Sequence, residues 1–235
     1  MKIHRSALSG ILLAVALSGQ AGSWQSSIDA ALRAQQQGDR ELNLRHLKDA
    51  LQQAEAFGEA DPRFTQTLDL MGEYYLDQNE PAKAEEFIRQ GLALRERFLG
   101  PQHYDVASSL DGLGRVFQAR RQYEQAQEYY ERALTIRERL LGSEDPWVAA
   151  SLEHLADFAL ARDDFDQADS FYQRALAIRE SSAEPSELAA SLEAISGHFL
   201  RRGERSRSTA YAERALAPWS LGFPSVSTGG VLAVR

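Results

Sequence analysis

Residues 110–142 read LDGLGRVFQARRQYEQAQEYYERALTIRERLLG, and the apolar columns of this stretch recur along the chain. A period of about 42 residues with helical apolar spacing predicts helical hairpins that stack, because no single hairpin can bury its apolar face alone. The sequence therefore predicts an all-α solenoid of about five antiparallel hairpins. The leucines that head four of the units lie 42, 42 and 40 residues apart: Leu68, Leu110, Leu152 and Leu192.

Proline, glycine and acidic turn residues divide the chain into pairs of helices. Residues 22–57 are predicted to form a degenerate first hairpin, and residues 58–217 four regular repeats. Asp61 and Asp145 each precede a proline, so we expect both to cap the helix that follows. The expected helix pairs are 24–36 with 40–57, 62–77 with 81–98, 104–119 with 123–140, 145–161 with 165–182, and 186–201 with 204–217.

Large and small apolar residues alternate between the two helices of each unit. In one unit Leu110 and Phe117 share a face of the first helix, and Tyr130 lies on the facing side of the second. Small residues in one column allow two helix backbones to approach closely, and the large residues fill the remaining space. This column consists of Gly72, Gly114, Ala156 and Ser196.

The ends of the second helices carry a recurring motif. ALRERFLG at 93–100 is followed by Asp105-Val106-Ala107, and TIRERLLG recurs at 135–142. Together with the columns above, this motif resembles the tetratricopeptide repeat, in the longer variant of kinesin light chains. The resemblance covers residues 58–217 and extends more weakly over 24–57. It implies a right-handed superhelix whose concave face holds a partner segment, and it implies no particular substrate.

One column of acidic residues follows the core leucine of four units, where the resemblance would place it on the concave face. An aligned acidic groove would attract a basic protein or peptide segment. The alternative is an ordinary solvated face whose carboxylates are satisfied by neighbours on the helix. The column is Asp69, Asp111, Glu153 and Glu193, and the hypothetical partner-binding set adds Glu73, Arg115, His154 and Asp157.

The sequence carries no pattern that points to catalysis. Its 235 residues include no cysteine, and the five histidines show no two-ligand helical spacing. Glycine-rich phosphate loops and nucleophile elbows are absent as well. We therefore expect no enzyme activity, cofactor, metal or small-molecule substrate.

The amino-terminal residues have the three parts of a secretory signal peptide. Basic Lys2, His4 and Arg5 precede an apolar run over 7–17, and small residues follow. This run is shorter than the ~20 residues that a membrane-spanning helix needs. We expect cleavage after Ala21 and a soluble, exported protein in the periplasm, not a lipoprotein. A membrane association is expected only if this segment is retained as an anchor.

Charge and the carboxy-terminal residues narrow the partner class. Without residues 1–21 the chain has 24 basic and 34 acidic residues, about −10 in net charge, which argues against nucleic acid or an anionic membrane as partner. Residues 218–235 are expected to form a flexible or capping tail. The favoured function is a scaffold that captures a protein segment. The alternative is a self-associating structural module of a cell-envelope assembly, and the oligomeric state stays open.

Overall fold

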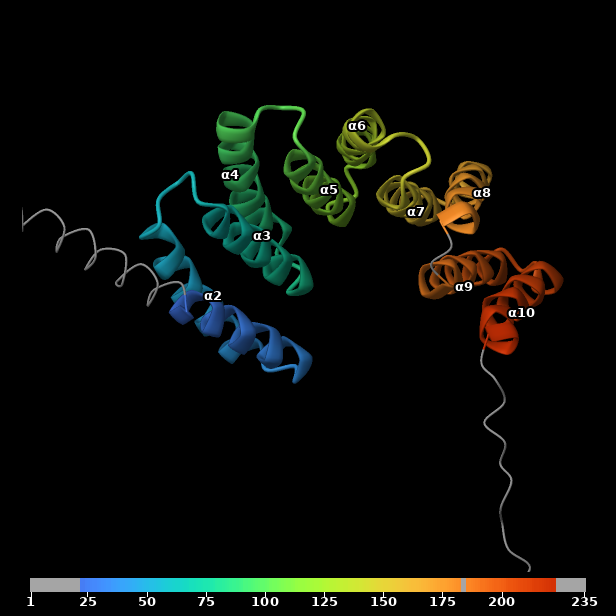
Figure 1. The fold of residues 1–235 in the computed structure, drawn as a ribbon, viewed down its shortest axis with the longest axis horizontal. Helices are drawn as coiled ribbons and strands as arrows, with labels where there is room; N and C mark the ends of the chain where they lie inside the picture. The colour runs from blue at the N-terminus through green and yellow to red at the C-terminus, as the bar shows by residue number, and fades with distance from the viewer. Residues whose placement is uncertain (1–21, 183–184, 223–235) are drawn as a thin grey trace, which may run out of the picture. The chain divides into compact units, whose positions relative to one another are not determined.

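The computed structural model describes residues 22–182 and 185–222, which form consecutive pairs of packed α-helices (Figure 1). No strand occurs in these two ranges, so the all-α prediction is confirmed. The first helix covers residues 22–36. The helices that follow it are α2 (Arg40–Glu55), α3 (Pro62–Asp77), α4 (Pro81–Leu99), α5 (Tyr104–Ala119), α6 (Tyr123–Leu141), α7 (Pro146–Ala161), α8 (Phe165–Ser182), α9 (Pro185–Arg201) and α10 (Arg205–Gly222).

The helix boundaries follow the turn chemistry of the sequence. The carboxylate of Asp61 accepts a hydrogen bond of 2.9 Å from the amide of Arg63, and Asp145 caps α7 in the same way through Trp147, at 2.8 Å. The main departure from expectation lies at the last helix, which continues to Gly222, five residues beyond the expected end. The predicted tail thus includes the end of a helix, and its residues 223–235 lie outside the described part of the chain.

The turns inside the hairpins share one backbone conformation. Residues at equivalent places have positive φ values: 74° at Gly38, 58° at Asn79, 59° at Arg121, 59° at Asp163 and 83° at Gly203. Each repeat therefore reverses the chain through a single left-handed residue, a conformation that glycine and asparagine tolerate best.

The chain divides into two compact units, Met1–Ile136 and Arg137–Arg235, with the boundary inside α6. In the first unit, the small column allows the close helix crossing that the sequence predicts. A Cβ atom on Gly114 would lie 2.6 Å from Cε1 of Tyr130, and one on Gly72 would lie 2.4 Å from Cγ1 of Ile88. Glycine is therefore needed at both positions for the side chain of the second helix to lie against the first.

Trp24 joins the first helix to the core of the first unit. Its ring lies in a buried cluster with Phe64, Leu68 and Leu94, and its indole N–H donates a hydrogen bond of 3.0 Å to the hydroxyl of Thr67. The degenerate hairpin is thus attached to α3 by both packing and a hydrogen bond.

The core of the second unit is formed by α7, α8, α9 and α10. Ala156, Tyr172, Leu192 and Phe199 belong to one buried cluster. At the last crossing Ser196 replaces the small apolar residue, and its hydroxyl donates a hydrogen bond of 2.8 Å to the carbonyl of Ser208.

Candidate functional site

The first member of the acidic column is paired with a buried arginine. Arg95, on α4, is 7 % exposed, and it donates to both carboxylate oxygens of Asp69, on α3, at 2.8 and 2.5 Å. The same guanidinium donates a hydrogen bond of 2.6 Å to the hydroxyl of Ser109, on α5. Arg95 therefore connects its own hairpin to the next one, and Asp69 is a structural acceptor.

Burial also affects the protonation of this carboxylate. It raises the pKa of Asp69 above its usual value, and the two hydrogen bonds from Arg95 act in the opposite direction. A carboxylate that is half-buried and bound at both oxygens has little capacity left for a partner's cation.

Asp111 holds the equivalent position on α5 and is also removed from solvent. Its side chain is 8 % exposed. An exposed acidic stripe along the first helices is thus absent at two of the four expected positions, both of which lie in the first unit.

The second unit repeats the arrangement. Arg179, on α8, donates to both carboxylate oxygens of Glu153, on α7, at 3.4 and 3.3 Å. The hydroxyl of Ser191, on α9, donates to the same carboxylate, and Arg179 also contacts Glu187. Arg137 begins this unit with a hydrogen bond of 2.6 Å to the hydroxyl of Ser151.

Glu193, the last member of the column, is exposed on α9. In the repeats where the pair is seen, the arginine follows the acid by 26 residues. Counting 26 residues from Glu193 reaches Trp219, whose side chain lies outside the described residues. The series of paired arginines therefore has no arginine at this position in the last repeat.

The remaining residues of the hypothetical partner-binding set differ in their surroundings. Glu73 and Arg115 are exposed on α3 and α5 and form an ion pair of 3.3 Å. His154 and Asp157 are exposed on α7, where Asp157 accepts a hydrogen bond of 2.5 Å from the hydroxyl of Tyr172. Burial and this hydrogen bond raise the pKa of Tyr172 well above its usual value. Of this set, Glu73, Arg115 and His154 keep the exposure that a binding surface requires.

The arginines that organise the column were not predicted from the sequence as its partners. We had interpreted Arg95, Arg137 and Arg179 as cations near the ends of helices. The constant spacing of 26 residues from acid to arginine, with a serine 14 residues after Arg95 and Arg137, was the signal that could have revealed them. Such a spacing gives no contact by itself, because the hairpin geometry is needed to bring the two side chains together.

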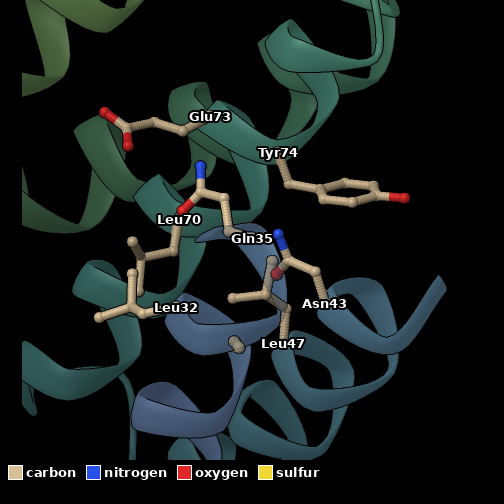
Figure 2. A pocket seen from close by; sticks show the side chains of 8 residues that line it. Leu32, Gln35, Asn43, Leu47, Leu70, Glu73 and Tyr74 are labelled. Atoms are coloured by element: carbon tan, nitrogen blue, oxygen red, sulfur yellow. The ribbon is translucent and has the colours of Figure 1, made fainter. Parts of the chain in front are cut away.

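Two pockets of the first unit lie along the face made by the first helix and α3. One of about 160 Å³ is lined by residues that include Gln35, Asp39, Asn43 and Asp77. A smaller one, of about 10 Å³, lies between Leu32, Gln35, Asn43 and Leu70 (Figure 2). Sequence reasoning did not select these residues, because they belong to the least regular hairpin.

A third pocket, of about 280 Å³, continues this face onto α5. Leu76 and Asp77 line it from α3, and Arg115 and Gln118 line it from α5. Asp77 accepts a hydrogen bond of 3.1 Å from the neutral amide of Gln35. This carboxylate lines two of the three pockets. We call the face lined by the three pockets the inner groove of the first unit.

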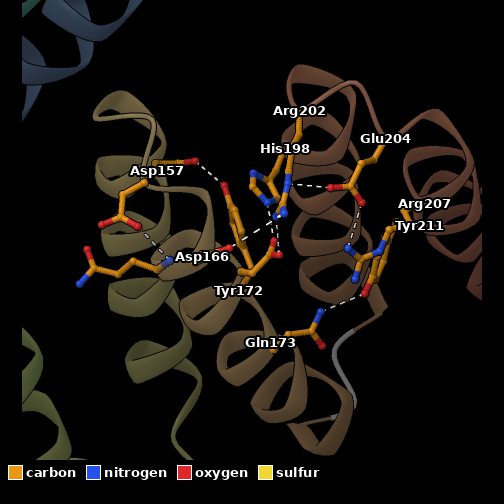
Figure 3. A network of polar contacts seen from close by, with 12 residues as sticks. Asp157, Asp166, Tyr172, Gln173, His198, Arg202, Glu204, Arg207 and Tyr211 are labelled. Carbon is orange, nitrogen blue, oxygen red and sulfur yellow. Dashed lines mark hydrogen bonds and ion pairs between the residues drawn. The ribbon is translucent and has the colours of Figure 1, made fainter.

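A buried polar network occupies the second unit (Figure 3). Nε2 of His198 lies 2.5 Å from Oδ1 of Asp169, and Arg202 donates to the other carboxylate oxygen at 2.8 Å. The histidine is 0 % exposed and is packed among aromatic rings. Within residues 22–182 and 185–222, no group of three or more histidine, aspartate or glutamate side chains could hold a metal ion.

The tetratricopeptide-repeat family model matches residues 65–139 and, in an overlapping register, 105–181. The chain is a tetratricopeptide-repeat protein. The overlap of the two matches by one repeat reflects the 42-residue period. No curated protein matches this tetratricopeptide-repeat chain significantly.

Solved structures agree with the fold of this tetratricopeptide-repeat protein. BtubC (BKLC) from P. vanneervenii has a TM-score of 0.69 and 24 % identity, covering 94 % of this chain and 98 % of that one. A putative kinesin light chain of Podosopora anserina has a TM-score of 0.65 and 22 % identity, with 82 % and 92 % covered. A Rap protein complexed with competence and sporulation factor has a TM-score of 0.65 and 15 % identity, with 81 % and 53 % covered.

Proposed function

We propose that this chain is an exported, non-enzymatic scaffold that captures a segment of a partner protein on the inner groove of its first unit. The observation that carries the proposal is the contrast between two sets of acidic residues. Asp69 is already bound to Arg95, whereas Asp77 is exposed, receives only a neutral amide and lines two pockets.

Peptide capture is consistent with the family. Tetratricopeptide-repeat proteins are generally scaffolds, and the Rap structure contains a protein of this fold in complex with competence and sporulation factor. Pockets lined by leucine, amide and carboxylate side chains suit a peptide, since apolar walls give affinity and a few polar groups fix orientation.

The proposal that the chain is exported rests on residues 1–21, where basic residues precede an apolar run. None of the helices in residues 22–182 and 185–222 is long and apolar enough to cross a membrane. Soluble delivery to the periplasm after cleavage therefore remains part of the proposal. Mass spectrometry of the mature chain tests it, and an amino terminus at Met1 would contradict cleavage.

Self-association is the second candidate function, and exposed apolar side chains in the second unit favour it. Trp147 and Leu200 are each 59 % exposed, and Leu216 is 67 % exposed. Large exposed apolar residues can mark protein contacts. Sedimentation at several protein concentrations tests this possibility: a mass that rises with concentration supports it, and a constant monomer mass rejects it.

Capture of a partner from cell-envelope extract tests the scaffold proposal. The test variant combines Glu73→Lys and Asp77→Lys, which reverse charge in the inner groove. The matched control combines Glu124→Lys and Glu128→Lys, which reverse two exposed charges on α6. We expect the native chain and the control to retain the same partner and the groove variant to lose it. Equal capture by all three proteins would reject the inner groove as the binding surface.

A further inference from the structure

The fourth residue of each second helix lies at the crossing of its hairpin, and the first hairpin differs there. Alanine fills this position in the three middle repeats, where each side chain is 0 % exposed. The first hairpin has Asn43, which is 6 % exposed, and the last has Ser208, at 8 %. The middle residues are Ala84, Ala126 and Ala168.

The two polar replacements are not equivalent. Ser208 lies 3.1 Å from the hydroxyl of Ser196, and its backbone carbonyl accepts a hydrogen bond from that hydroxyl. The Asn43 side chain makes no hydrogen bond with any described residue. A buried polar group without a partner costs stability, so an amide in place of a small alanine calls for an explanation.

The surroundings of Asn43 supply one (Figure 2). Its amide is aimed into the space between Gln35, Leu70 and Tyr74, from the floor of the smaller pocket. The larger pocket of the inner groove, of about 160 Å³, also includes Asn43, Gln35 and Tyr74 in its lining. Asn43 is thus the amide that both pockets share at their base.

The chemistry of the two pockets is complementary to a short peptide. A side-chain amide carries a donor and an acceptor, which match the carbonyl and N–H of a peptide backbone. Leu32, 41 % exposed, and Leu70 offer an apolar contact on one side. On the other side the carboxylates of Asp39 and Asp77 face one basic side chain, Arg40, so the larger pocket carries an excess of negative charge.

We propose that Asn43 binds the backbone of an extended partner segment that carries an apolar residue and a neighbouring lysine or arginine. The apolar residue packs on Leu32 and Leu70, and the cation lies at Asp77. This inference rests on the proposed function and specifies the chemistry of the partner. Charge complementarity at Asp77 selects a basic segment over an acidic one.

Two acetylated and amidated peptides test the inference, Ala-Leu-Ala-Lys-Ala and its glutamate analogue Ala-Leu-Ala-Glu-Ala. They are titrated into the isotopically labelled full chain while the side-chain amide resonances are followed by NMR. We expect the Asn43 resonance, identified by its absence from Asn43→Ala, to shift saturably with the lysine peptide. The glutamate peptide should bind at least 10-fold more weakly.

Variants separate binding from folding. Asn43→Ala introduces the residue of the middle repeats, so its melting temperature should equal or exceed that of the native chain while peptide affinity falls at least 10-fold. Asp77→Asn should abolish the preference for lysine over glutamate. Gln52→Ala, an exposed change on the same helix, serves as the control and should leave both unchanged.

Native affinity in Asn43→Ala would overturn the inference. An unmoved Asn43 resonance while the lysine peptide shifts others would also overturn it and would leave the scaffold function standing. Failure of the proposed function looks different, because the native chain would then capture no partner from envelope extract.

Discussion

The first and second hairpins are built on one repeat plan, and they fill the same positions with different chemistry. In the second hairpin, Arg95 joins Asp69 to Ser109 through charged hydrogen bonds. In the first hairpin the equivalent pair is neutral: the Gln53 amide donates a hydrogen bond of 3.2 Å to the hydroxyl of Ser27. The regular repeat thus uses a buried ion pair where the degenerate one uses two uncharged side chains.

This difference shows how one hairpin can be specialised without loss of the fold. The first hairpin contains two amides with unused hydrogen-bonding capacity, the buried Oε1 of Gln53 and the side chain of Asn43. It compensates through Trp24, which is 5 % exposed. We infer that apolar packing stabilises the first hairpin and that the polar positions are thereby available for binding.

Trp24→Ala should give the largest effect on this comparison. Removing a buried aromatic side chain costs about 3–5 kcal/mol, and chemical denaturation of the native and mutant chains measures it. Trp24→Phe keeps most of the packing and loses the hydrogen bond to Thr67, so it should cost only about 1 kcal/mol. Equal losses in the two variants would show that the hydrogen bond, and not packing, attaches the first hairpin.

Arg95→Gln should have the next largest effect, since it leaves Asp69 without its cation. We expect a loss of about 2 kcal/mol, less than for a fully buried pair because Asp69 is 32 % exposed. Adding Asp69→Ser reproduces the neutral pair of the first hairpin and should recover about 1 kcal/mol. A double-mutant cycle measures the coupling, and strictly additive losses would contradict a specific pair.

Exchange of the crossing residues should have opposite effects in the two hairpins. Asn43→Ala removes an unpaired buried amide and should stabilise the chain by about 1 kcal/mol. Ala84→Asn inserts an amide into a packed crossing and should destabilise it by about 2 kcal/mol. Thermal unfolding of both variants measures the contrast. Destabilisation by Asn43→Ala would mean that the amide has a structural role in the first hairpin.

The smallest effect is expected from pH at Asp61, the cap that begins the second hairpin. Hydrogen bonds from Arg63 lower the pKa of this carboxyl, against the effect of burial. The stability it contributes is therefore present above its unfolded pKa of about 4 and lost as pH falls through the folded pKa. Asp61→Ser keeps a capping oxygen without this titration. Its stability relative to the native chain should improve by up to about 1 kcal/mol between pH 7 and pH 3, as unfolding at each pH would show.

The sequence by itself determined the repeat and its helices. Small residues, apolar columns and turn signals recur every 40 to 42 residues, and each acts over one or two helical turns. Asp61, Gly114 and Asn79 therefore reveal a cap, a close crossing and a turn before any contact is known. Local propensity and packing periodicity agree here, which is why the helix pairs could be predicted closely.

Only the tertiary structure decided the chemistry of the acidic column. Asp69 and Arg95 are 26 residues apart, and their contact depends on how two helices of a hairpin face each other. The same reason hid Asn43, because a periodic pattern treats a departure from alanine as wear. Whether a polar side chain is paired or left open to a pocket depends on groups from other helices, and the sequence pattern alone does not place those groups around it.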